Sequence, residues 1–260
     1  MILLLKLALA PTSILLATLA ARRFGHGISG LLSGFPIIGG PIVLALMFEL
    51  RPDQVADIGV ATLAACPAAI AHIVTFAWLS RRLPWWGCLM GAVAAFFAVG
   101  SVTTADWMPT GLQIALAIAG PFVALVVMPR VAPLRGAVPV PRAEIAMRVG
   151  ATFILAAAVV LSAEHVPAAV SGLLLAWPIS GSILPSFTLP AYGHAATVTL
   201  LRGFAIGLVG FVTFFVALAG LLHAWDSNAP AFAAAMALSV AAGWTVHTLR
   251  TRASRDGMKR

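Results

Sequence analysis

Two segments of this chain, 142 positions apart, carry nearly the same run of hydroxyl, glycine and proline residues. Residues 28–41 read ISGLLSGFPIIGGP and residues 170–183 read VSGLLLAWPISGSI, and both lie inside long apolar stretches. Proline lacks a backbone N–H and clashes with the preceding helical turn, while glycine lowers the cost of leaving the helix. We therefore predict that each segment is a helix broken at its proline, Pro36 or Pro178.

Each break would create a site for a polar or anionic group. The half-helix that begins after the proline presents the positive end of its dipole, which binds anions. Unpaired backbone at membrane depth is tolerated only where it is buried in protein or lines a wet cavity, and matched broken spans mark the binding sites of many transporters. The predicted substrate site therefore lies between the breaks, and its candidate residues are Ser33, Gly34, Pro36, Gly39, Ala176, Pro178, Ser180 and Gly181.

Two ionisable residues within apolar stretches, His72 and Arg202, complete the candidate site. Such residues are costly inside a membrane and are functional candidates by default. His72 could relay protons or could hydrogen-bond a neighbouring helix, and the sequence does not separate these alternatives. Arg202 could meet an anionic substrate, although snorkelling of its long side chain to the membrane surface is the favoured interpretation. Lys6 and Arg148 occupy equivalent positions near helix ends, where snorkelling again suffices, and their pairing makes them candidates for matched gates.

The repeated motif also has a purely structural interpretation. Gly30 and Gly34 are spaced like Gly172 and Ala176, and small residues four apart allow membrane helices to pack closely. On this alternative the prolines are packing kinks and no cavity forms.

The composition places the whole chain in a membrane. Of 260 residues, 61% are hydrophobic and 9% are charged, and the mean hydropathy is +1.03, whereas soluble domains carry about 25% charged residues. The net charge is +8, but the arginines sit in short loops between apolar stretches, so no nucleic-acid partner is predicted. Cys66 and Cys88 both lie in apolar segments and predict neither a disulfide framework nor a metal site. No metal or other cofactor is expected.

The hydropathy pattern predicts nine membrane-spanning helices. They cover about residues 2–20, 28–48, 55–80, 84–104, 109–128, 146–163, 168–190, 195–222 and 230–250. If the N-terminus lies outside, every lysine and arginine except Lys6 and Arg51 falls on the cytoplasmic side. Cytoplasmic loops are enriched in these residues, so we predict an outside N-terminus and a cytoplasmic C-terminus.

The two motifs belong to two copies of a four-helix unit. Residues 1–105 would form one repeat and 146–260 the other, joined by a helix and a Pro/Arg-rich cytoplasmic linker at 106–145. The sequence VTF at 74–76 recurs at 212–214, an offset of 138. Equivalent helices are an odd number of crossings apart, so the copies lie in opposite orientations. The predicted fold is an all-α polytopic membrane protein with a 4+1+4 inverted repeat, as in secondary transporters.

The stretch from Ile28 to Pro36, preceded by one apolar helix and Arg22-Arg23, resembles the GlpM-like small bacterial inner-membrane proteins. That family has about one copy of this unit, so the resemblance covers each half and implies a fused, inverted pair. The second copy departs from the motif, with Trp177 in place of Phe35. The resemblance implies a bacterial inner-membrane protein connected with envelope and exopolysaccharide production, and it implies no substrate.

These features predict a transporter rather than an enzyme. The chain has no zinc-protease, nucleophile-elbow or Walker motif, so no catalytic residues are assigned and ATP is not the driving force. We expect a secondary transporter or flippase in the bacterial inner membrane. Its partners would be the lipid bilayer and a small-molecule or lipid-linked substrate, with an anion preferred, and a homo-oligomer is left open. The alternative is a non-transporting membrane scaffold for an envelope or polysaccharide biosynthesis complex.

Overall fold

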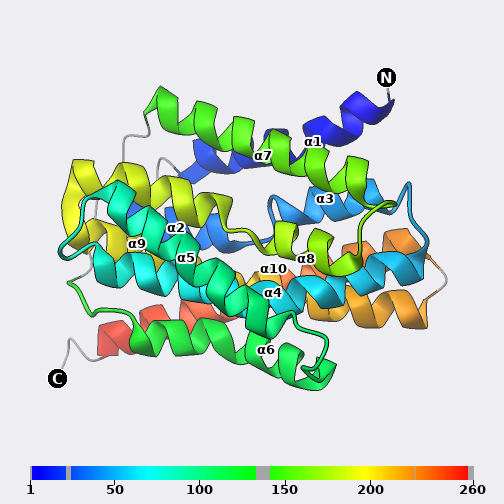
Figure 1. Ribbon diagram of the computed structural model, residues 1–260. Coiled ribbons are helices and arrows are strands. Elements are labelled where there is room, and N and C mark those ends of the chain that lie inside the picture. Colours follow the sequence, from blue (N-terminus) through cyan, green and yellow to red (C-terminus); the bar gives the residue numbers. More distant parts are fainter. Residues whose placement is uncertain (1, 22–24, 133–140, 226, 257–260) are drawn as a thin grey trace.

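The computed structural model describes residues 2–21, 25–132, 141–225 and 227–256, and all regular structure in these ranges is helical. The helices are α1 (Ile2–Ala21), α2 (Gly25–Gly34), α3 (Gly39–Leu46), α4 (Pro52–Leu79), α5 (Trp85–Thr103), α6 (Thr110–Val127), α7 (Arg142–Ser162), α8 (Ala168–Ala176), α9 (Ile179–Ala224) and α10 (Asn228–Asp256). They form one bundle and run roughly along a common direction (Figure 1). Seven stretches of the described chain are long and apolar enough to cross a membrane, judged by length and composition. The predicted all-α class is confirmed, and the helices suit a multi-pass membrane protein.

The longest helix, α9, doubles back on itself. Together with α8 it belongs to an apolar stretch of 55 residues, Ala168–Leu222. A straight helix of that length would measure about 80 Å, against a bilayer core of about 30 Å. The bend lies at Gly193, whose φ of 77° and ψ of −176° are accessible to glycine and strained for other residues. The two arms of α9 therefore run in opposite directions (Figure 1), and the bend falls between the spans predicted at 168–190 and 195–222.

Both repeated motifs are broken helices, as predicted. Four residues separate α2 from α3, and two separate α8 from α9. The backbone N–H of Ile179 donates to the carbonyl oxygen of Trp177 at 2.9 Å, and Pro178 between them has φ −82° and ψ 71°. These values describe an inverse γ-turn. The N–H of Ile37 donates to the carbonyl oxygen of Phe35 at 2.7 Å. The first break therefore contains the same hydrogen bond between residues i and i+2.

Glycines let the half-helices pack directly on the backbone of long helices. A methyl group on Gly30 of α2 would strike the carbonyl of Leu200 on α9. A methyl group on Gly172 of α8 would strike the backbone of Ala61 and Thr62 on α4. At Gly30 and Gly172, each half-helix therefore contacts the backbone of a long helix so closely that a side chain would clash.

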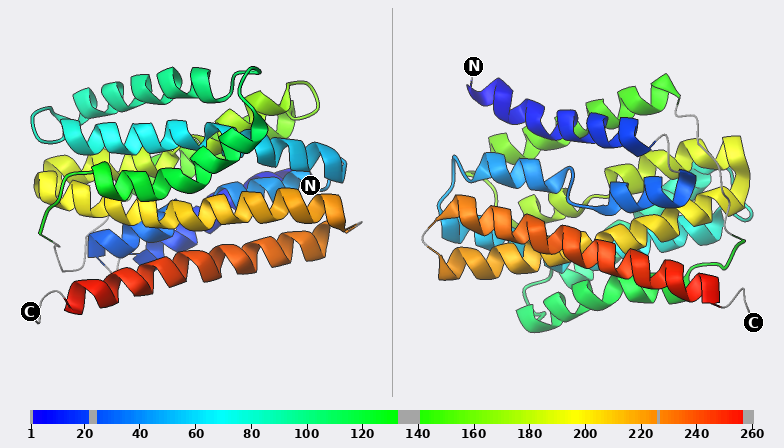
Figure 2. Two further views of the ribbon diagram at one scale, coloured as in Figure 1. Left: turned by 90° about the horizontal axis from the view of Figure 1, so that it is seen from below. Right: turned by 180° about the vertical axis from the view of Figure 1, so that it is seen from behind.

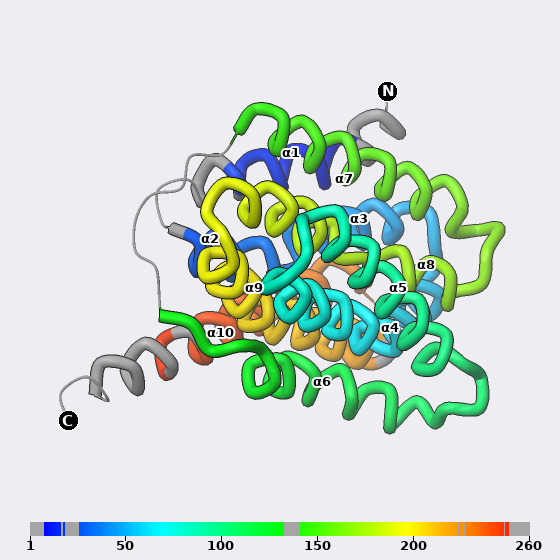
Figure 3. Tube along the Cα trace, turned by 60° about the vertical axis from the view of Figure 1, so that its left-hand side comes forward, coloured from blue at the N-terminus to red at the C-terminus, as the bar shows by residue number. Residues whose placement is uncertain are grey.

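The long helices α4 and α9 form the centre of the bundle, and the other helices surround them. α5 packs on α4, and α10 packs on the second arm of α9. α1 and α7 lie side by side along one edge, while α6 lies along the opposite edge (Figures 1 and 3). The outer helices present large exposed apolar side chains, among them Met90, Val126 and Ile154. Such a surface suits contact with lipid.

Candidate functional site

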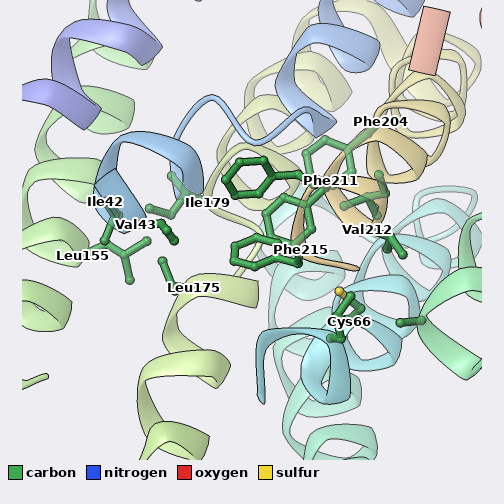
Figure 4. Close-up of a cluster of buried hydrophobic side chains, with 14 of the residues drawn as sticks. Ile42, Val43, Cys66, Leu155, Leu175, Ile179, Phe204, Phe211, Val212 and Phe215 are labelled. Atoms are coloured by element: carbon green, nitrogen blue, oxygen red, sulfur yellow. The ribbon is translucent and has the colours of Figure 1, made fainter. Parts of the chain in front are cut away.

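The two breaks form the walls of one small cavity. It is lined by Ser33, Gly34, Phe35, Ile38, Gly39, Cys66, Ala69, Leu175, Ala176, Trp177, Pro178, Ile179, Ser180, Phe204, Leu208 and Phe211. Its volume is about 40 Å³, which leaves room for roughly two or three water molecules. Figure 4 shows part of the apolar wall, where side chains of α4, α8 and α9 converge beside the second break. Apart from the Cys66 thiol and the Trp177 indole N–H, the polar side chains of the cavity lining are Ser33 and Ser180.

A buried arginine from a third helix joins these two serines. The Nη2 atom of Arg148 on α7 donates to Ser33 Oγ at 2.9 Å and to Ser180 Oγ at 3.2 Å. Arg148 is only 2% exposed, so its guanidinium is held away from lipid and water. One cation therefore links the last turn of α2 to the first turn of α9. Its Nε is buried without a hydrogen-bond partner.

A carboxylate one turn away accompanies this cation. Glu144 lies 3.8 Å from Nη1 of Arg148, at the i,i+4 spacing of a helix, and is itself 6% exposed. The desolvation of a buried ion pair is offset only by close geometry and additional hydrogen bonds. The serine hydroxyls supply such bonds, and the planar guanidinium fork is suited to several acceptors at once.

Local sequence explains why these groups meet. α7 begins after Pro141, which is extended, so Arg148 comes about two turns into the helix. The turn at Pro178 starts α9 at Ile179 and places Ser180 in its first turn. Ser33 is the second-last residue of α2, immediately before the first break.

His72 is not part of the cavity lining, but it contacts the second break. Its Nε2 lies 3.1 Å from Ser182 Oγ, and that hydroxyl donates to the carbonyl of Pro178 at 2.9 Å. The rings of His72 and Trp177 meet edge to face, with centroids 5.9 Å apart. Of the two alternatives left open by the sequence, hydrogen bonding to a neighbouring helix is present. Proton relay stays a prediction, and Nδ1 of His72 is buried without a hydrogen-bond partner.

The other candidate residues divide between the cavity and its surroundings. Gly34, Gly39, Ala176 and Pro178 line it, as do the two serines. Pro36 faces a separate groove, and Gly181 packs beside Pro178 and Ile73. Arg202 lies away from the cavity wall, where its Nη1 donates to the carbonyls of Met128 and Pro129 at 3.2 and 3.4 Å, just beyond α6.

The structure assigns roles to residues that sequence reasoning underrated or missed. Snorkelling, the simplest interpretation of Arg148, is wrong, because its side chain is buried between the breaks. Its equivalent Lys6 has a side chain outside the described residues. Glu144 and Ser182 were not singled out, although the i,i+4 pairing of Glu144 with Arg148 before an apolar run is a readable signal.

The described residues offer no cluster of three metal-binding side chains, and both cysteines are free thiols. The site is a small cavity between two broken helices, where the hydroxyls of Ser33 and Ser180 bind the buried guanidinium of Arg148. No protein-family model, curated protein or solved structure matches this chain.

Proposed function

We propose that this protein is a secondary transporter or flippase whose substrate binds between the two broken helices, with an anionic group next to Arg148. The observation that carries the proposal is the joint cavity, because its two hydroxyl groups come from different breaks and are held by one buried guanidinium. A pair of packing kinks does not require a shared cavity or a shared cation.

The charges around the second break favour an anion. The first turn of α9 presents backbone N–H groups and the positive end of the helix dipole. Arg148 brings a positive charge to Ser180 through Nη2, while its Nη1 lies 3.8 Å from the carboxylate of Glu144. An incoming anion could accept hydrogen bonds from the guanidinium and from the two serine hydroxyls. Charge-assisted hydrogen bonds of this type are stronger than those between neutral groups.

The packing of the two halves supports an inverted repeat. With the offset of 142 for the motifs, Gly30 corresponds to Gly172, and with the offset of 138, Thr62 corresponds to Leu200. Gly30 packs on Leu200, and Gly172 packs on Thr62. The first-half contact thus has its counterpart in the second half. The neighbouring helices α1 and α7, which correspond to one another, run in opposite directions (Figure 1).

In such a protein, substrate access alternates as one repeat rocks against the other around the central site. We infer nine crossings, with α2–α3 as one crossing and the bent α9 contributing to two. An outside N-terminus and a bacterial inner-membrane location follow from the distribution of arginine and from the resemblance to GlpM-like proteins.

The native Cys66 provides the test, because it lines the cavity, whereas Cys88 is buried elsewhere. In the Cys88→Ala variant, Cys66 is exposed to small, membrane-impermeant methanethiosulfonates, one anionic and one cationic, from each side of the membrane. We expect Cys66 to react, and to react faster with the anionic reagent. The Cys66→Ala variant, which retains only Cys88, should stay unlabelled.

A second variant tests the breaks themselves. Replacing both Pro36 and Pro178 with alanine restores the missing backbone donors and favours continuous helices. This change should abolish the labelling of Cys66. The opposite result is that Cys66 in the Cys88→Ala variant is no more reactive, from either side, than Cys88 in the Cys66→Ala variant. The breaks would then be packing kinks, and the scaffold alternative would replace transport.

A further inference from the structure

A wide apolar groove lies beside the cavity, on the face formed by α1, the α2–α3 break and α10 (Figure 2, right). Its volume is about 590 Å³, and its lining includes Ser13 of α1, Phe35 and Pro36 at the first break, and Val240 and Trp244 of α10. Ser13 is the one residue of this lining with a polar side chain other than Trp244, and its hydroxyl donates to the carbonyl of Leu9. Val240 and Trp244 are 52% and 64% exposed, so the groove opens to the surroundings of the bundle.

Phe35 is shared by the groove and the cavity. Its side chain belongs to the lining of both, directly at the first break. The ring sits where glycines leave room for it, because a methyl group on Gly210 would lie 2.6 Å from its Cε1 and one on Gly243 would also strike the ring. One aromatic residue thus borders both an apolar groove open to lipid and the small cavity whose two serines bind Arg148.

The two spaces differ in the chemistry that they accept. The groove has an apolar lining and a size typical of ligand sites. The cavity is small, and its hydroxyls lie beside a buried cation. A molecule that satisfies both has a long hydrocarbon part and a compact anionic part, which is the chemistry of an anionic lipid of the bilayer.

We propose that the substrate is an anionic lipid, with its acyl chain in the groove between α1, α2–α3 and α10 and its headgroup passing Phe35 to Arg148, Ser33 and Ser180. This inference rests on the proposed function and specifies its substrate class. The lipid would enter the groove laterally from the bilayer, and not from the aqueous phase.

The test is photo-crosslinking in vesicles with the full-length protein. Two sets of phosphatidylcholine vesicles are compared. One contains a trace of phosphatidylglycerol with a photoactivatable acyl chain, and the other contains a trace of phosphatidylcholine with the same label. The crosslinked peptides are identified by mass spectrometry. We expect crosslinks to concentrate in α2, α3 and α10. Both lipids carry a phosphate, but the choline ammonium of phosphatidylcholine neutralises its charge and is repelled by Arg148. Phosphatidylglycerol should therefore give roughly tenfold more crosslinking than phosphatidylcholine.

Matched variants separate the groove from the general lipid surface. Val240→Trp fills the groove, while Val126→Trp adds the same bulk to an exposed position of α6. V240W should remove most of the crosslinking to α2 and α3, and V126W should leave it unchanged. Ser33→Ala with Ser180→Ala should lower the preference for phosphatidylglycerol without moving the crosslinks out of the groove.

Three outcomes overturn the lipid inference. Equal yields from both lipids would mean ordinary boundary lipid, crosslinks spread over all outer helices would mean no site, and a change of oligomeric mass in V240W would make the groove an interface between copies. If Cys66 is labelled while any of these holds, transport through the breaks stands and the lipid substrate fails. If the crosslinks are as expected but Cys66 is inert, the lipid is bound and the proposed transport fails.

Discussion

At the scale of single residues, Arg148 is the central finding. A long cationic side chain near a helix end usually keeps its charge at the membrane surface. This one is 2% exposed and is held by two hydroxyls and a carboxylate. The high cost of desolvating a charge means that such an arrangement is kept only where its partners compensate.

We expect Glu144→Gln to destabilise the protein strongly. The substitution leaves Arg148 buried without its carboxylate, and breaking a buried pair costs about 3–5 kcal/mol. Thermal unfolding of the detergent-purified protein would measure the loss. Asp53→Asn is the matched control, because Asp53 pairs with Arg51 at 2.9 Å on the surface, with side chains 61% and 74% exposed. That pair is worth about 0–1 kcal/mol. Equal shifts in the two variants would refute a structural role for the buried pair.

At the scale of helices, close packing and breakage occur in the same segments. α2 approaches α9 through glycines on both sides, because a methyl group on Gly203 would strike the carbonyl of Gly27, and one on Gly207 that of Leu31. The packing interpretation of the small-residue pattern is therefore correct for these helices. It does not replace the functional interpretation, because the same half-helices end at the cavity.

We predict that Gly30→Ala and Gly172→Ala each destabilise the bundle. The added methyl group meets backbone that cannot move aside without separating two helices, and overpacking of this type costs about 1–3 kcal/mol. Gly220→Ala on α9 is the control, since nothing lies within 4 Å of the added carbon. It should raise stability by about 0.5–1 kcal/mol, because alanine favours the helix. Melting temperatures of the three variants, compared with that of the unchanged protein, test this prediction. An unchanged melting temperature in Gly30→Ala would show that α2 is loosely packed.

At the scale of the whole molecule, the direction of each helix determines which ends face the same side. The connection between α4 and α5 and the connection between α5 and α6 lie at opposite ends of α5. Arg82 is exposed in the first connection and Trp107 in the second. The positive-inside rule predicts that Arg82 lies in the cytoplasm and Trp107 outside.

Single cysteines at these two positions test the orientation in a background without Cys66 and Cys88. We expect Trp107→Cys to react with an impermeant thiol reagent in intact cells. Arg82→Cys should react only after the membrane is permeabilised. The reverse pattern would invert the whole topology, while reaction of both from outside would exclude α5 as a crossing.

Features that depend on neighbouring residues could be predicted from the sequence alone. Prolines and glycines within apolar runs predicted both helix breaks, and the hydropathy pattern placed the helices to within a few residues, including the bend near Gly193. These signals are local because a missing donor or a missing Cβ acts on its own turn.

Which side chains meet depends on the packing of helices that are distant in the chain. Ser33 and Arg148 are 115 positions apart in the sequence, and the packing of α1 against α2 and α7 brings them together. No local sequence pattern predicts that contact. For the same reason the side chain of Arg202 on α9, a candidate site residue in the sequence, reaches the carbonyls just beyond α6 instead of the cavity, and His72 binds Ser182. A buried charge goes where partners exist, and those partners are brought together by helices distant in the chain.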